Sequence, residues 1–153
     1  MADNLNLDTQ ALNATMLKFG APDSCIYCYQ HWIVMLRPQQ VTLGALVLAA
    51  LEPVKAFSEL SSESFIELAQ VTRDIESCLK KVFEYDKLNY LMLMMVDPDV
   101  HFHVIPRYAD MKIFAGTEFR DAAWPGPPDL SGSNKTDDVM NQKIIDLLSA
   151  NWK

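Results

Sequence analysis

The chain has 153 residues, of which half are hydrophobic and 22 % are charged, so it can form one domain with its own core. Its formal net charge of −7 argues against a protein that coats nucleic acid, but allows a small anionic ligand in a local pocket. Three cysteines do not make a disulfide framework, and an odd number suits a reducing compartment. The N-terminus lacks a signal peptide, and the longest apolar run, residues 43–51, is too short to span a bilayer. We therefore expect a cytoplasmic protein without a membrane partner.

The first part of the chain predicts a short helix and a hairpin. Asp8 can cap a helix that runs to about Phe19 and stops at Gly20. Residues 25–30 are interpreted as a short transition. Two apolar strands follow, and the turn between them predicts a hairpin over residues 32–49.

The middle of the chain predicts a long helix and a second hairpin. Ser61 or Ser62 can cap the helix, and its apolar residues follow a helical period to about residue 83. Two further strands are predicted at residues 88–96 and 99–105, and the tight Asp-Pro turn between them makes the strands antiparallel.

The last part of the chain predicts loops followed by a helix. Residues 107–133 are rich in loop-forming residues, and Thr136 or Asp137 can cap the final helix. The order of helices and hairpins along the chain indicates the α+β class, with an antiparallel sheet and the long helix packed on one of its faces.

The run DVHFHVIPR, residues 99–107, is the most informative stretch of the sequence. His101 and His103 are two of the three histidines in the chain, and they lie two residues apart in a predicted strand. Because side chains alternate faces along a strand, both imidazoles project to the same side, and so does Asp99. A buried apolar strand gains nothing from two imidazoles unless they bind or react with something.

This run resembles the signature of the histidine triad (HIT) superfamily, His-x-His-x-His followed by two apolar residues and often Pro-Arg. The order of hairpin, long helix, strand and signature strand is also similar, so the resemblance covers residues 25–108. It implies a HIT-like antiparallel sheet of about five strands, with a helical extension over 1–24 and a loop and helix over 109–153 packed on the same domain. Phe114-Ala115-Gly116 and Trp124-Pro125-Gly126 resemble a bacterial-type branch.

The resemblance implies a nucleotide hydrolase or transferase that cleaves a nucleoside monophosphate from a small leaving group, as in dinucleoside polyphosphates or nucleoside phosphoramidates. His101 would be the nucleophile that forms a nucleotidyl-histidine intermediate, and His103 would hydrogen-bond the phosphate or the neighbouring backbone. No cofactor is required for this chemistry. The resemblance also implies a homodimer, with the apolar third strand and the long helix at its interface. The expected substrate-binding residues are Arg37, Gly44, Asn89, Arg107 and Trp124.

Two features depart from the resemblance. The first triad position is Asp99, whose carboxylate would add negative charge near an anionic substrate and raise the pKa of a nearby histidine. The glycine-containing loop that often precedes the triad is reduced to Val96-Asp97-Pro98. These departures favour an alternative, a non-catalytic nucleotide-binding protein on the same fold with a decayed active site.

Metal binding is a further alternative. Cys25 and Cys28 have the spacing of zinc ligands, with His31 three residues later, but a single pair of this kind is a weak signal and two buried reduced thiols are the favoured interpretation. Some HIT proteins bind structural zinc at such a pair, and here the positions of the completing histidines hold Ala45 and Asp99. The side chains of Asp99, His101 and His103 could also hold a divalent ion, although His31 is the only other histidine that could complete that site.

Overall fold

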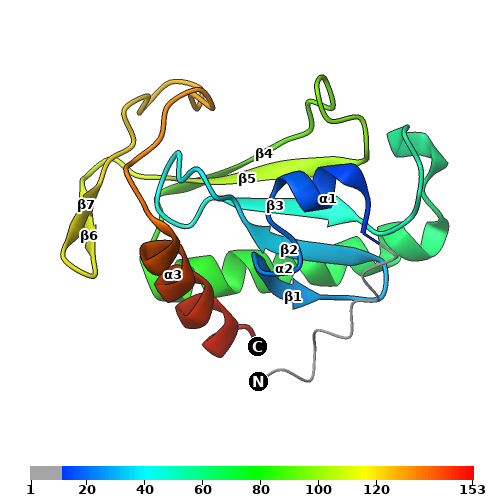
Figure 1. The fold of residues 1–153 in the computed structure, drawn as a ribbon, viewed down its shortest axis with the longest axis horizontal. Helices are drawn as coiled ribbons and strands as arrows, with labels where there is room; N and C mark the ends of the chain where they lie inside the picture. The colour runs from blue at the N-terminus through cyan, green and yellow to red at the C-terminus, as the bar shows by residue number, and fades with distance from the viewer. Residues whose placement is uncertain (1–11) are drawn as a thin grey trace.

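The computed structural model describes residues 12–153 and contains a five-stranded sheet in the order β1-β2-β3-β5-β4 (Figure 1). Every neighbouring pair in this sheet is antiparallel, so the predicted α+β class and the expected number of strands are confirmed. The strands are β1 (Cys25–Cys28), β2 (Trp32–Leu36), β3 (Leu46–Ala50), β4 (Lys87–Leu91) and β5 (His101–Arg107).

The two predicted hairpins are present, with different strand lengths. Strands β2 and β3 pair from Trp32 opposite Ala50 to Leu36 opposite Leu46, and all their residues are buried. Strand β4 pairs with β5 but ends at Leu91, so the prediction of a strand through residue 96 is wrong. After Leu91 the chain leaves the sheet in a loop in which Met94 has a positive φ of 48°, a conformation that a strand does not allow. Leu93, Met95 and Val96 are exposed there, whereas Met92 and Met94 are half-buried against the core.

Helix α2 (Ser62–Phe83) covers one face of the sheet, as predicted (Figure 1). Its N-cap is Ser61, whose hydroxyl accepts a hydrogen bond from the Ser64 amide at 3.1 Å. The buried stripe of the helix includes Ile75 and Leu79, which share a core with alternate residues of β2, β3 and β5. Each such side chain contributes about 1.5–3 kcal/mol by leaving water.

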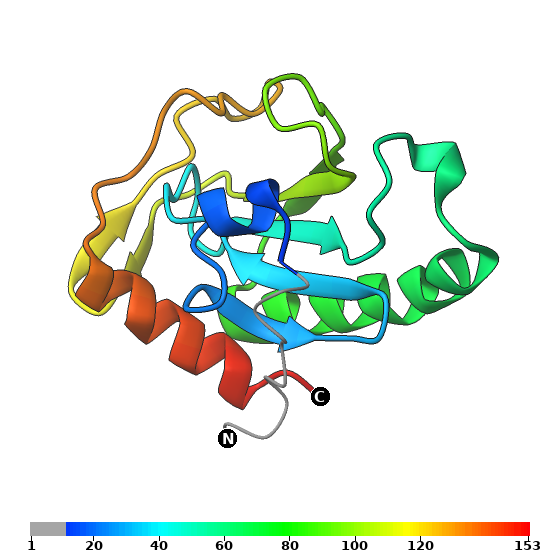
Figure 2. The same cartoon turned by 45° about the vertical axis from the view of Figure 1, so that its right-hand side comes forward.

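The opposite face of the sheet is covered in part by helix α1 (Ala14–Lys18), shown at the start of the coloured chain in Figure 2. Met16 and Phe19 pack there on the odd-numbered residues of β2 and β3. The described helix begins at Ala14 with Asn13 as its N-cap. It is therefore shorter than predicted, and the expected cap, Asp8, lies outside the described residues.

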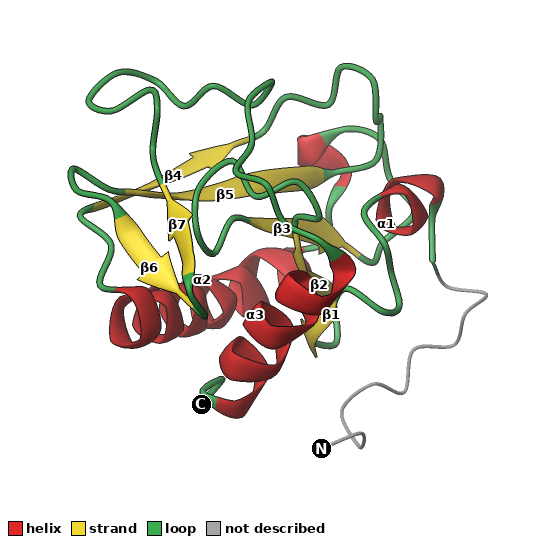
Figure 3. Ribbon diagram, turned by 60° about the vertical axis from the view of Figure 1, so that its left-hand side comes forward, coloured by secondary structure: helices red, strands yellow, loops and turns green. Residues whose placement is uncertain are grey.

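Two strand regions were not predicted. Strand β1 occupies the segment interpreted as a transition, and it pairs with β2 through an irregular register. Strands β6 (Lys112–Phe114) and β7 (Thr117–Phe119) form a small separate hairpin within the loop-rich region (Figure 3). Both residues of its turn, Ala115 and Gly116, have positive φ, as a tight hairpin requires. Runs of three residues are too short to show a sequence period.

The chain ends with the predicted C-terminal helix, α3 (Asp138–Ala150), capped by Asp137. Ile144 and Leu148 anchor it in the core that α2 and β1 share, so the C-terminal segment packs on the sheet. A short 3-10 helix, η2 (Phe57–Glu59), precedes α2. Within residues 12–153, no helix has the length and apolar character needed to cross a membrane.

Candidate functional site

The two histidines of the signature lie side by side on the face of the sheet that carries α1. In β5, His101 is opposite Ala49 and His103 is opposite Val47 of β3. Their ring centroids are 5.1 Å apart, and the ring of Phe19 packs against both of them. The predicted projection of both imidazoles to one side of the strand is therefore what the structure shows.

The backbone orients the His101 ring. Its Nδ1 atom lies 2.7 Å from the carbonyl oxygen of Asp99. Because a carbonyl oxygen only accepts, this contact places a proton on Nδ1, so in the neutral form of the ring the lone pair is on Nε2. His101 is only 1 % exposed, since Phe19 lies over it. The imidazole is thus fixed in the tautomer that a nucleophile needs, beneath the residues of α1.

His103 is a neutral imidazole at the edge of a pocket. Burial lowers its pKa to about 4, and the nearby His101 and Arg37 act in the same direction. Its Nδ1 atom is buried and has no hydrogen-bond partner among the described residues. At neutral pH this side chain therefore brings a hydrogen-bonding group into the pocket without a positive charge.

The Asp99 carboxylate points to two other segments of the chain. Its Oδ2 atom accepts a hydrogen bond of 2.7 Å from the Thr15 hydroxyl, and its Oδ1 atom lies 2.8 Å from the Lys55 ammonium. Burial raises the pKa of Asp99, but the hydrogen bonds from Lys55 and Thr15 outweigh it, so the pKa is lowered. The sequence predicted that the Asp99 carboxylate would project from the same strand face as the two imidazoles. That prediction is wrong, because β5 begins only at His101.

A pocket of about 400 Å³ opens beside His103. The loop between β4 and β5 and the end of α1 form its walls, and Lys18 forms an ion pair with Asp97 at 2.8 Å between these two segments. His101 is not part of the lining. The other lining residues are Phe19, Arg37, Pro38, Gln39, Val96 and Leu130.

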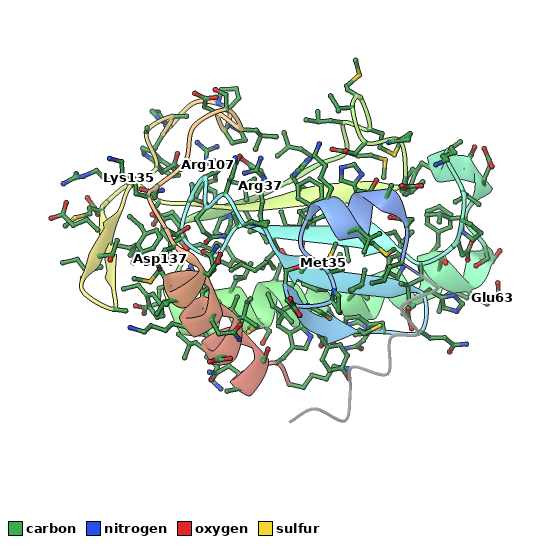
Figure 4. The ribbon with its side chains drawn as sticks, viewed as in Figure 1. Met35, Arg37, Glu63, Arg107, Lys135 and Asp137 are labelled. Atoms are coloured by element: carbon green, nitrogen blue, oxygen red, sulfur yellow. The ribbon has the colours of Figure 1, made fainter. Side chains whose placement is uncertain are left out.

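Arg37 lies in this pocket where the chain leaves β2 (Figure 4). It is 8 % exposed, and burial lowers the pKa of its guanidinium. Nη1 donates to the Gln39 carbonyl at 2.7 Å and Nη2 to the Leu130 carbonyl at 3.4 Å, whereas Nε has no partner among the described residues. The sequence analysis named this residue, and the structure brings it to the same pocket as His103.

The structure places the other expected substrate-binding residues elsewhere. Asn89, Arg107 and Trp124 line a separate pocket of about 500 Å³ at the far end of β4 and β5. Gly44 lies under α2, where a Cβ atom would come within 2.8 Å of Phe83. Since its φ is also +84°, glycine is required there by the backbone and by packing.

The cysteine pair shows no metal-binding arrangement. Within residues 12–153, no three side chains of His, Cys, Asp or Glu lie together as a metal site. Burial raises the pKa of Cys25 to about 12 and also raises the pKa of Cys28, which keeps both thiols protonated. His31 instead donates its backbone N–H to Glu67 at 2.6 Å.

Several residues around the histidines were not found from the sequence. Thr15, Lys18 and Phe19 come from α1, and Lys55 comes from the loop after β3. Asp97 was singled out only as part of a turn. No local pattern marks these side chains, because their role depends on contacts across 44 to 84 residues of sequence.

The fold has been seen in solved structures. No protein-family model and no curated protein sequence matches the chain. A histidine triad protein from Bradyrhizobium japonicum is 21 % identical, with a TM-score of 0.71, over 93 % of this chain and 97 % of that one. A histidine triad protein from Sinorhizobium meliloti is 20 % identical, with a TM-score of 0.72, over 92 % and 95 %.

A third similar structure carries a stated activity. The diadenosine triphosphate hydrolase of Plasmodium falciparum, in complex with cyclomarin A, is 12 % identical, with a TM-score of 0.60, over 84 % of this chain and 76 % of that chain. The chain therefore has the histidine triad fold, as the run DVHFHVIPR predicted.

Proposed function

We propose that this protein is a histidine triad nucleotide hydrolase or nucleotidyl transferase in which His101 is the nucleophile. The observation that carries the proposal is the contact of His101 Nδ1 with the Asp99 carbonyl, which selects the neutral tautomer with its lone pair on Nε2. A neutral imidazole held in one orientation can attack an α-phosphorus without first losing a proton. The histidine triad fold and its hydrolase neighbour support the same reaction class.

The proposed reaction has two displacements. In the first, Nε2 of His101 forms a bond to the α-phosphorus, and the bond from phosphorus to the leaving group breaks. The leaving group departs with the electron pair and takes up a proton from solvent. In the second, water attacks the phosphorus and loses a proton to solvent, the N–P bond breaks with its electron pair returning to Nε2, and the nucleoside monophosphate and neutral imidazole are released. Splitting the displacement in this way replaces one difficult step with two easier ones.

The pocket beside His103 supplies the binding groups in this proposal. Its volume of about 400 Å³ is in the range of small-molecule sites. His103 offers a neutral hydrogen-bonding group, and Arg37 offers a positive charge to phosphate oxygens. Phosphoryl-type transfer depends mainly on positioning, and these side chains would hold the nucleotide beside His101.

A second candidate function is nucleotide binding without turnover. His101 is 1 % exposed, Phe19 covers it, and Thr15 ties α1 to Asp99. In the catalytic proposal, α1 moves aside when substrate binds. In the alternative, α1 stays in place, and the nucleotide occupies only the outer pocket beside His103.

A homodimer is also part of the proposal. Beyond the edge strand β4, Met95 and Val96 are 85 % and 84 % exposed, and Leu93 is also exposed. On α2, Ile66 adds another exposed apolar side chain. Apolar surface beside a free strand edge is typical of a face that a second subunit covers, which supports the interface expected from the sequence.

The test of the proposed function is product analysis. Wild type, His101→Ala and His31→Ala are incubated with adenosine phosphoramidate, diadenosine polyphosphates and adenylyl sulfate, and AMP release is measured. We expect AMP from wild type and from His31→Ala, and a loss of at least about a thousandfold in His101→Ala, because the nucleophile is missing. His31 is the matched control because it lies outside the pocket. Nucleotide binding without AMP release from wild type, across the whole panel, would favour the binding protein instead.

A further inference from the structure

Arg37 is a buried cation that no carboxylate within residues 12–153 neutralises. Its exposure is 8 %, and both of its hydrogen bonds go to backbone carbonyls. No ion pair to Arg37 is formed by any Asp or Glu that the structure describes. A buried, unpaired charge costs several kcal/mol unless an opposite charge joins it. The pocket therefore contains a guanidinium that an anion would stabilise.

The other charged or titratable side chains of the pocket do not fill this role. Lys18 has its own partner in Asp97, at 2.8 and 2.9 Å. His103 is neutral at pH 7, because burial lowers its pKa to about 4. Among the described lining residues, Arg37 is thus the cation whose charge is available to a bound anion.

The strand register separates Arg37 from His101. Ile33 of β2 lies opposite Ala49 of β3, which lies opposite His101 of β5. Arg37 follows Ile33 by four residues and continues the ladder by donating its N–H to the Ala45 carbonyl at 2.9 Å. Two strand spacings and four residues of rise correspond to about 16 Å between the Cα atoms of His101 and Arg37. Arg37 also lines a pocket to which His101 does not contribute, so a phosphate under attack by His101 and an anion at Arg37 would be different parts of one ligand.

We propose that the pocket recognises a second anionic group of the substrate at Arg37, in addition to the phosphate that reacts at His101. This inference rests on the proposed function and narrows its substrate class to nucleotides with at least two anionic groups. The second group is phosphate-like, since a guanidinium with a free Nε–H matches its oxygens. It can belong to the 5′ phosphate chain or to a phosphate on the ribose, and the two sources are separable by experiment.

The test measures binding by isothermal titration calorimetry. The ligands are AMP, ADP and adenosine 3′,5′-bisphosphate, and the proteins are wild type, Arg37→Met and Arg37→Lys. We expect wild type to bind ADP or the 3′,5′-bisphosphate at least tenfold more tightly than AMP. Arg37→Met should reduce that preference to within twofold, and Arg37→Lys should keep most of it. The ligand that is preferred identifies which end of the nucleotide carries the second group.

Two results would overturn the inference. One is binding of all three ligands to wild type within twofold of each other, and the other is a preference that survives in Arg37→Met. Either would leave the proposed function intact, since AMP still binds and AMP release is measured separately. Failure of all three ligands to bind would overturn the proposed function together with the inference. If Arg37→Met does not fold, the wild-type comparison and Arg37→Lys still decide.

Discussion

The two buried arginines of this protein, Arg37 and Arg107, differ in how their charge is balanced. Arg107 is 4 % exposed, and the Asp121 carboxylate accepts from its Nε at 2.7 Å and from its Nη2 at 3.1 Å. Asn89 and the Gly126 carbonyl accept two further hydrogen bonds. Arg37 is almost equally buried, but in the part of the chain that the structure describes its hydrogen-bond acceptors are two backbone carbonyls. Figure 4 labels both side chains.

In our proposal this difference separates an arginine whose charge is used within the fold from one that binds a ligand. The pairing of Arg107 with Asp121 ties the C-terminal loop to the end of β5, so its charge is used within the fold. Arg37 keeps one N–H unused and faces a pocket. Burial alone does not tell these roles apart, whereas the presence of a carboxylate partner does.

Removing the ion pair between Arg107 and Asp121 should have the largest effect on the free energy of unfolding. Asp121→Asn removes the negative charge and leaves a buried guanidinium without compensation, which typically costs about 3–5 kcal/mol. We expect this loss in the free energy of unfolding from urea titration. In the same assay Arg37→Met should change stability by less than half as much, because that arginine has no ion pair to lose. Equal losses in the two variants would refute the comparison.

The pH dependence of stability gives the next largest effect. The pKa of His103 is about 4 in the folded protein against 6.5 ordinarily, so the unfolded chain binds more protons between these values. The contribution of His103 is complete above pH 6.5 and is lost as the pH falls toward 4, by on the order of 3 kcal/mol.

The measurement is urea unfolding at several pH values, with His103→Gln as the reference. The difference between the two proteins isolates the histidine from the carboxylates that titrate in the same range. Because the Arg37 charge helps lower the pKa of His103, Arg37→Met should narrow the pH window. An identical pH profile in wild type and His103→Gln would show that His103 is not buried as described.

The smallest expected effect is on nucleotide affinity and concerns Lys18, which lines the same pocket as Arg37. Asp97→Asn removes the partner of Lys18 and makes it a second unpaired cation at the pocket. We expect AMP to bind about two- to fivefold more tightly, a modest gain because the pair is partly exposed and screened by water. Titration calorimetry measures the change, and the double variant Asp97→Asn/Lys18→Met should reverse it. Weaker binding by Asp97→Asn would mean that the ion pair shapes the pocket.

The parts of the fold that could be predicted are those with a local signal. Helix α2 carries its capping serine and a clear apolar period, and the β2–β3 hairpin consists of two apolar runs around a turn. The short strands β1, β6 and β7 have no such signal. The apolar run after Leu91 misled the prediction because hydrophobicity there marks exposed surface.

The candidate site shows the same division. The histidine pair follows from strand alternation, a local property, and so it could be predicted. Arg107 and Arg37 could both be predicted as anion-binding candidates from the sequence. The sequence does not show that Asp121 neutralises Arg107, or that no described carboxylate neutralises Arg37. Such partners are set by segments that meet only in the folded chain.

The contacts of Asp99 link three positions that are distant in sequence. Its carboxylate holds Thr15 and Lys55, while its carbonyl holds His101. A histidine at position 99 would keep the carbonyl but would lose both side-chain contacts, and Lys55 would then meet an imidazole. Introducing a histidine by that one change would therefore remove one of the ties of α1 and alter the polar side chains next to His101. Positions 15, 55 and 99 share one set of contacts, and we expect close relatives of this chain to change them together.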